Sequence, residues 1–153
     1  MRSFQEWIED YSKSHQNPQN KKIHNVCVPA ITFSLLGLLY TVPYPQNLQW
    51  EIFNNWAILF ILPSLMFYWM LNKKIFIGML LQTVLYLSVL FLIQDRFIIF
   101  WLSLILFILA WIGQFYGHKI EGKKPSFFKD LLFLMIGPIW VVKNIYDKLG
   151  IRY

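Results

Sequence analysis

Long apolar runs, broken by short polar segments, dominate the pattern along this chain. Four of them approach the roughly 20 residues that a helix needs to cross a bilayer. They cover residues 26–44, 52–71, 75–93 and 97–116. The breaks carry turn-forming or charged residues, and Asp95 and Arg96 between the last two runs would be costly at the bilayer centre. The pattern therefore predicts an all-α, polytopic membrane protein with four transmembrane helices.

The residues before the first run follow a different, amphipathic pattern. Ser3 and Glu6 have the spacing of a helix capping box. The apolar residues that follow recur at helical spacing on one face: Phe4, Trp7, Ile8 and Tyr11. This predicts a short amphipathic helix on the membrane surface, and its lack of an apolar core argues against a signal peptide. We expect Asn17-Pro18 to end this helix and Asn20 to cap the next one.

A shorter apolar run near the C-terminus covers residues 131–142 and contains Gly137-Pro138. It falls well short of the roughly 20 residues of a bilayer span, so it predicts an interfacial or re-entrant helix. The chain shows no internal repeat and no long linker. We therefore expect a single membrane-embedded domain over residues 1–153.

Composition and charge fit a membrane protein and suggest an orientation. The chain is 57% hydrophobic and 14% charged, with a net charge of +6, whereas soluble domains carry about 25% charged residues. Apart from Arg96, all Lys and Arg lie before the first run, at Lys73-Lys74 or after the fourth run. The positive-inside rule then predicts that both termini are cytoplasmic, in a bacterial inner membrane or in the endoplasmic reticulum. No basic segment with base-stacking aromatics indicates nucleic-acid binding, and the single Cys27 excludes a thiolate metal site.

Three histidines are the candidate chemistry, because the predicted topology brings His15, His24 and His118 to one membrane face. Imidazoles from segments distant in sequence could surround one metal ion. Glu121 follows His118 by three residues, so on a continued helix it would add a carboxylate to the same face. Such a donor set suits iron, zinc, manganese or nickel.

Polar residues accompany these candidate ligands. Asn17, Asn20 and Gln114 could orient ligand nitrogens, although capping and turn formation explain the two asparagines equally well. Three lysines flank His118 and Glu121 in the sequence: Lys119, Lys123 and Lys124. They would attract an anionic headgroup or a substrate carboxylate, or would simply set the topology.

Two sequence blocks carry a resemblance to a known family. Residues 15–24 (HQNPQNKKIH) and 117–125 (GHKIEGKKP) resemble the 2-hydroxy fatty acid dioxygenases, typified by a yeast enzyme of phytosphingosine breakdown. The resemblance implies an iron(II)-dependent membrane enzyme that converts a 2-hydroxy fatty acid and dioxygen into the acid one carbon shorter. It also implies that His15, His24 and His118 bind the iron. Glu121 stands one residue closer to His118 than in the family pattern, so it is a fourth ligand, a group that supports the ligands, or a partner for Lys123 or Lys124.

The implied chemistry suits a site at the cytoplasmic face of a bilayer. A 2-hydroxy carboxylate offers two adjacent oxygens to one metal ion, while its alkyl tail lies in the membrane between kinked spans. The alternatives are a non-catalytic lipid-binding or structural membrane protein, a small transporter and a haem protein. A transporter would want ionisable residues in mid-span, whereas Glu51 and Asp95 lie at edges. A haem protein would want histidines facing one another within helices. The pattern carries no prediction of oligomeric state.

Overall fold

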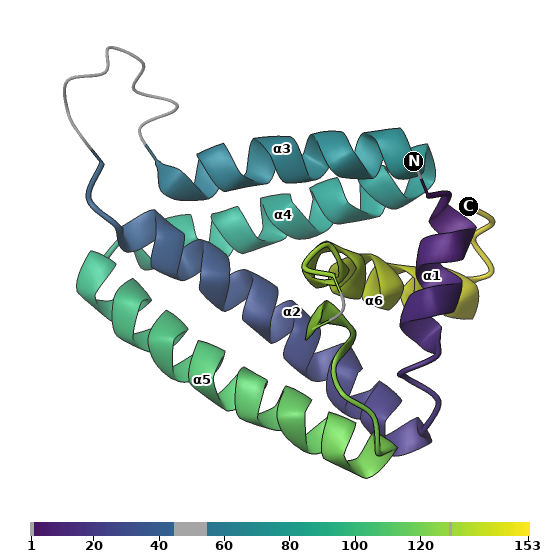
Figure 1. Ribbon diagram of the computed structural model, residues 1–153. Coiled ribbons are helices and arrows are strands. Elements are labelled where there is room, and N and C mark those ends of the chain that lie inside the picture. Colours follow the sequence, from purple (N-terminus) through teal and green to yellow (C-terminus); the bar gives the residue numbers. More distant parts are fainter. Residues whose placement is uncertain (1, 45–54, 129) are drawn as a thin grey trace.

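The computed structural model describes residues 2–44, 55–128 and 130–153, and these residues form helices and connecting segments (Figure 1). The elements in chain order are α1 (Phe4–Ser12), α2 (Pro18–Thr41), α3 (Trp56–Leu71), α4 (Lys73–Ile93), α5 (Arg96–Glu121), the 3-10 helix η2 (Ser126–Phe128) and α6 (Phe133–Leu149). The predicted all-α class is confirmed. Helices α2 and α5 run side by side, as do α3 and α4, and α1 and α6 lie together near one end of these pairs.

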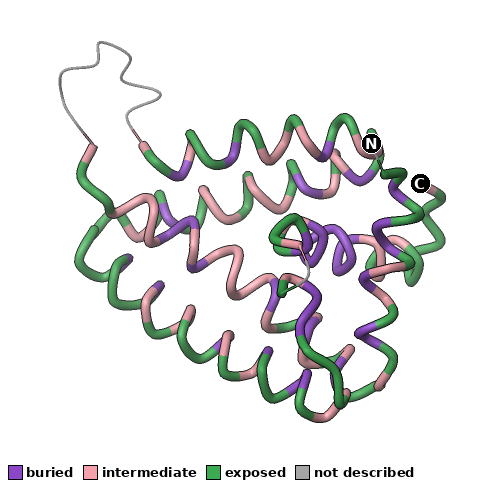
Figure 2. The backbone as a smooth tube through the Cα atoms, viewed as in Figure 1, coloured by how far each residue is buried: buried purple, intermediate pink, exposed green. Residues whose placement is uncertain are grey.

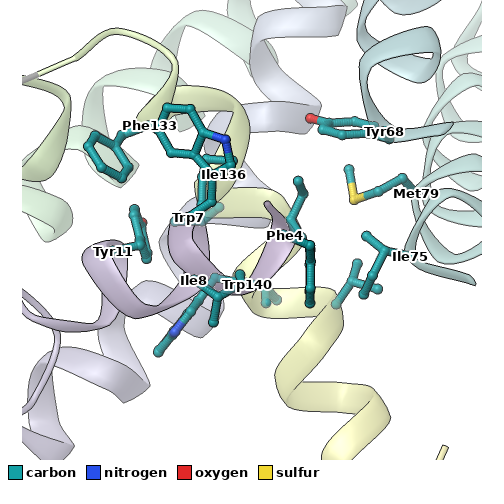
Figure 3. Close-up of a cluster of buried hydrophobic side chains, with 14 residues drawn as sticks. Phe4, Trp7, Ile8, Tyr11, Tyr68, Ile75, Met79, Phe133, Ile136 and Trp140 are labelled. Atoms are coloured by element: carbon teal, nitrogen blue, oxygen red, sulfur yellow. The ribbon is translucent and has the colours of Figure 1, made fainter. Parts of the chain in front are cut away.

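Helix α1 forms as its sequence predicts. The Ser3 hydroxyl accepts a hydrogen bond from the Glu6 backbone N–H at 3.2 Å, and the Glu6 carboxylate accepts one from the Ser3 N–H at 2.6 Å, which completes the capping box. Its apolar face is buried, but against protein: the Trp7 and Phe133 rings meet edge to face with centroids 5.2 Å apart (Figure 3). The apolar face of α1 therefore packs against α6 and not against lipid, whereas the location of this helix at the membrane surface stays a prediction.

Helix α2 begins well before the predicted first span. Asn17, not Asn20, is the N-cap, since its side chain accepts a hydrogen bond from the Gln19 N–H at 2.8 Å. Pro18 occupies the first helical position, where its missing N–H costs nothing. The Asn17-Pro18 pair thus starts a helix instead of ending one, and the preceding helix already ends at Ser12. As a result, both Asn20 and His24 lie inside α2.

Tight turns separate the remaining apolar helices at the predicted breaks. Asn72 accepts hydrogen bonds from the backbone N–H groups of the first turn of α4, and Asp95 does the same at the start of α5. The first residues of the predicted second span, 52–54, and the segment 45–51 with Glu51 lie outside the described residues. Helix α5 continues past residue 116 to Glu121, which places His118 in its last turn.

Three described helices, α2, α4 and α5, are long and apolar enough to cross a membrane, and α3 is a shorter apolar helix of 16 residues. Large apolar side chains on these helices are exposed, for example Leu92 at 79% and Phe97 at 72%. Figure 2 shows exposed stretches along α3, α4 and α5. Apolar surface of this extent is typical of lipid contact. A membrane protein is therefore supported, whereas the count of four spans and the cytoplasmic termini stay predictions.

Helix α6 is longer than the apolar run that predicted it and packs into the core. Its stretch 136–142 is buried (Figure 2), and Ile136 and Trp140 join a cluster that also contains Tyr68 and Met79 (Figure 3). A Cβ atom on Gly78 would lie 2.6 Å from both Tyr146 Oη and Val142 Cγ1, so α4 and α6 approach closely. This packing holds α1 and α6 against the end of α2 where His24 lies.

Candidate metal centre

The three histidines converge from three parts of the chain. His15 lies between α1 and α2, His24 lies on α2 and His118 lies in the last turn of α5. Their exposed fractions are 0%, 2% and 5%. One ligand nitrogen from each ring lies within 4.8 Å of the others, and the Nε2 atoms of His24 and His118 are 3.2 Å apart. Because sequence-distant imidazoles meet in a buried layer, the cluster has the composition of a metal site.

Tyr11 holds two of the three rings. The Nδ1–H of His15 donates to the Tyr11 backbone carbonyl at 2.7 Å, and the two rings stack with centroids 4.1 Å apart. The Tyr11 hydroxyl lies 3.5 Å from Nδ1 of His24, where its oxygen can accept a hydrogen bond from that N–H. A proton on Nδ1 leaves Nε2 of each ring free to bind a metal ion.

Unpaired nitrogens in the cluster fit a metal ion. Nε2 of His15 and Nδ1 of His118 are buried without a hydrogen-bond partner, an arrangement that costs free energy unless a ligand satisfies it. Burial also lowers the pKa of His15 to about 4. The ring is therefore neutral at ordinary pH, the form that binds metals.

The structure does not bring Glu121 into the histidine cluster. One carboxylate oxygen accepts from the Gln16 N–H at 2.8 Å, and the other accepts from the Asn17 N–H at 2.8 Å and the Asn20 side-chain amide at 3.1 Å. These donors belong to the start of α2, where a negative charge is favoured by the helix dipole. Glu121 thus joins the two sequence blocks to each other, and its partners are these donors and not Lys123 or Lys124, the pairing considered as one alternative.

The three predicted supporting residues have different positions. Asn17 caps α2, which is the alternative role considered for it. Asn20 is fully buried and donates to Glu121 and, at 3.4 Å, to the Ser14 carbonyl. Gln114 is buried beside the histidines, and its amide nitrogen has no partner. The residues that contact the rings most directly, Tyr11 and Ser14, were not among the predicted site residues, although Tyr11 precedes His15 by one helical turn.

The lysines divide between two locations. Lys123 and Lys124 line an open surface pocket of about 800 Å³ together with Lys13 and Ser14. The Ser14 hydroxyl lies 3.4 Å from Nδ1 of His15 and is hydrogen-bonded to Ser126, so this basic pocket adjoins the histidine cluster. Lys119 is exposed, and it lines neither this pocket nor the small cavity beside the three histidines.

The histidine cluster borders a small cavity of about 60 Å³. Its polar lining comes from the three histidines and from Tyr11, Thr32, Gln114 and Ser126, and its remaining walls are largely apolar, including Val28 and Trp111. A cavity of this size holds only a few small molecules. The arrangement can therefore bind a metal ion and a small polar head group.

Taken together, these features define a class: a helical protein with apolar helices of membrane-spanning length and a buried three-histidine candidate metal centre. The model of a family described as "2-hydroxy-palmitic acid dioxygenase Mpo1-like" matches residues 1–149, and the chain belongs to this family. It is 34% identical over 143 residues to the 2-hydroxy-palmitic acid dioxygenase MPO1 of Saccharomyces cerevisiae, covering 92% of this chain and 78% of that protein. No solved structure matches the chain. The resemblance based on the two histidine blocks is confirmed.

Proposed function

We propose that this protein is a non-haem iron(II) dioxygenase of fatty acid α-oxidation, which converts long-chain 2-hydroxy fatty acids into acids one carbon shorter. The observation that carries the proposal is the convergence of His15, His24 and His118 in one buried cluster. Membership of a family named for a 2-hydroxy-palmitic acid dioxygenase supports the substrate class. A merely structural or lipid-binding protein would have no need for three buried imidazoles that lie together, two of them with an unpaired ring nitrogen.

The three histidines would hold the iron through one ring nitrogen each. Three imidazole ligands leave coordination positions open for a substrate and suit iron(II). When bound, iron(II) supplies the activation of dioxygen that the side chains themselves cannot provide. Tyr11 keeps the His15 and His24 rings in the orientation that presents Nε2 to the metal.

The acid head of the substrate would enter this cavity with its carboxylate and 2-hydroxyl oxygens facing the histidines. Lys123 and Lys124 attract the anion from the adjoining pocket. The unpaired amide nitrogen of Gln114 is a buried donor for one substrate oxygen. The reaction breaks the bond between the first two carbons. One dioxygen accepts four electrons, and the products are the shortened acid, carbon dioxide and water.

We further propose that the enzyme spans the bilayer several times with this site at the cytoplasmic face. The histidine cluster lies at the end of α2 and α5 that also carries Lys21 and Lys22 in the first turns of α2, and Lys119, Lys123 and Lys124 at or just after the end of α5. The positive-inside rule supports a cytoplasmic location for that end, in a bacterial inner membrane or in the endoplasmic reticulum.

Conversion of 2-hydroxypalmitic acid tests the proposal. Protein purified anaerobically in detergent is supplied with isotopically labelled dioxygen, with iron(II) added or withheld, and the products are analysed by mass spectrometry. We expect an iron-dependent acid one carbon shorter that carries labelled oxygen. Folded, iron-loaded protein that leaves this acid and longer 2-hydroxy acids unchanged would refute the proposed activity.

A further inference from the structure

A second, larger cavity lies beside the histidine cavity. Its volume is about 350 Å³, and its lining comes from α2, α3, α4, α5 and the α6 region. The walls are almost entirely apolar, and among the few hydroxyl groups are those of Thr32, Ser64 and Thr83. These three hydroxyls donate to backbone carbonyls within their own helices, so they offer no free donor to a polar ligand. We call this cavity the apolar chamber.

The apolar chamber adjoins the histidine cavity. Five residues line both cavities: Ile31, Thr32, Trp111, Leu134 and Pro138. A molecule with a polar head among the histidines could therefore extend an apolar tail past Trp111 into the chamber. A lipid tail without such a head would gain the same apolar walls but none of the polar groups.

The depth of the chamber corresponds to a long alkyl chain. Leu36 is among its lining residues and lies twelve positions after His24 on α2, roughly 18 Å along the helix. One leaflet of a bilayer contributes about 15 Å of hydrocarbon, which is the length that a long acyl chain fills. The distance from the histidines to the far wall is thus sufficient for a long-chain acid held at its head.

We propose that the apolar chamber binds the alkyl chain of the 2-hydroxy acid and that Ser64, in its wall, helps to set which chain lengths are accepted. This inference rests on the proposed function and adds a binding site for the tail. Ser64 lies on α3 and its hydroxyl donates to the Phe60 carbonyl of the same helix at 2.7 Å, so replacing it removes no hydrogen bond between elements. A larger side chain there would occupy chamber volume.

The chain offers a matched control on α4. Ser88 is exposed and donates to the Val84 carbonyl at 2.8 Å, the same local hydrogen bond as that of Ser64, but it does not line the chamber. Ser64→Phe and Ser88→Phe therefore make the same chemical change inside and outside the chamber.

The test measures kcat/KM for saturated 2-hydroxy acids of increasing chain length with the wild type and both variants. We expect Ser64→Phe to reduce kcat/KM for the longest acids by about tenfold or more while the shorter acids are converted nearly as before, because a filled pocket rejects added methylenes. Ser88→Phe should retain the wild-type profile. A Ser64→Phe profile that is unchanged, or lowered equally at every length in folded protein, would overturn the chamber assignment while leaving the proposed reaction intact.

A second readout does not need turnover. A long-chain 2-hydroxy acid with a photoreactive group at its tail is crosslinked to the full-length protein in detergent, and labelled peptides are mapped. Labelling near Leu36 and Phe60 that Ser64→Phe suppresses and Ser88→Phe does not would support the chamber even if no acid were converted. Labelling confined to the outer faces of the helices would overturn it.

Discussion

Tyr11 connects two of the candidate ligands through two different groups. Its backbone carbonyl accepts from His15 and its hydroxyl lies next to Nδ1 of His24. Burial raises the pKa of the hydroxyl, so it stays protonated and uncharged. The residue therefore orients both rings without adding charge beside the site.

We expect Tyr11→Phe to weaken iron binding about tenfold, since losing a group that orients a ligand histidine typically costs 10–100-fold in metal affinity and this contact is long. The aromatic stack and the backbone contact to His15 remain, so the fold should be retained. Iron affinity measured by competition with a chelator, alongside helical content by circular dichroism, checks this. An unchanged iron affinity would show that the Tyr11 hydroxyl does not support metal binding.

Replacing Glu121 separates a ligand from a structural group. Glu121→Gln removes the charge at the start of α2 and cannot accept all three hydrogen bonds equally well. We expect unaltered iron content and a loss of about 1.5–3 kcal/mol of stability, the range for hydrogen bonds to charged groups, seen as a lower melting temperature in detergent. Lost iron with an unchanged melting temperature would instead identify Glu121 as a ligand.

At the residue scale the sequence predicted which histidines meet but not what surrounds them. The offset between His118 and Glu121 shows that they share a helix face, yet it does not show that the face also meets the N–H groups at the start of α2. From its spacing, Tyr11 is one of the apolar residues of its helix. Spacing alone does not reveal that its buried hydroxyl lies next to His24 Nδ1 or that its carbonyl accepts from His15 Nδ1. Such details depend on packing between elements far apart in the chain.

At the element scale the close approach of α2 and α5 positions the histidine blocks. Gly117 faces the buried Asn20, and a Cβ atom there would overlap Asn20 Oδ1 and lie 3.3 Å from Ile23 Cγ2. Because Gly117 has no side chain, α5 leaves room for Asn20, which donates a hydrogen bond to Glu121.

Gly117→Ala should therefore destabilise the protein. In an open helix this change would stabilise it by about 1 kcal/mol, whereas overpacking here should cost about 1–3 kcal/mol. Thermal unfolding in detergent measures the sign, with Ser88→Ala on the exposed face of α4 as the control. A higher melting temperature for Gly117→Ala would contradict the tight α2–α5 contact.

The polar breaks predicted the helix order more reliably than the helix limits. Asn72 and Asp95 lie where the turns were expected, because short side chains that cap helices are recognisable from sequence. The start of α2 was misplaced because Asn-Pro can either end a helix or cap the next one. The amphipathic pattern of α1 predicted the helix correctly. It did not predict what covers the apolar face, because lipid and another helix such as α6 can both bury it.

At the scale of the whole molecule the candidate site depends on three separate parts of the chain. Helix α1 and the following loop supply Tyr11 and His15, α2 supplies His24, and α5 returns His118 to the same end (Figure 1). Helix α6 supports this assembly, with Trp140 donating to the Ser12 hydroxyl at 3.3 Å. A shared metal ion would therefore also tie the N-terminal segment to the apolar helices.

The iron content of the folded protein tests this account most directly. The protein is loaded anaerobically with iron(II), freed of excess metal and analysed for iron per chain, together with His15→Ala, His24→Ala and His118→Ala and a Lys148→Ala control. We predict about one iron per chain in the wild type and the control, and strong loss in each folded histidine variant. Full iron content after all three histidines are replaced, or folded wild-type protein that binds no iron, would contradict the central claim.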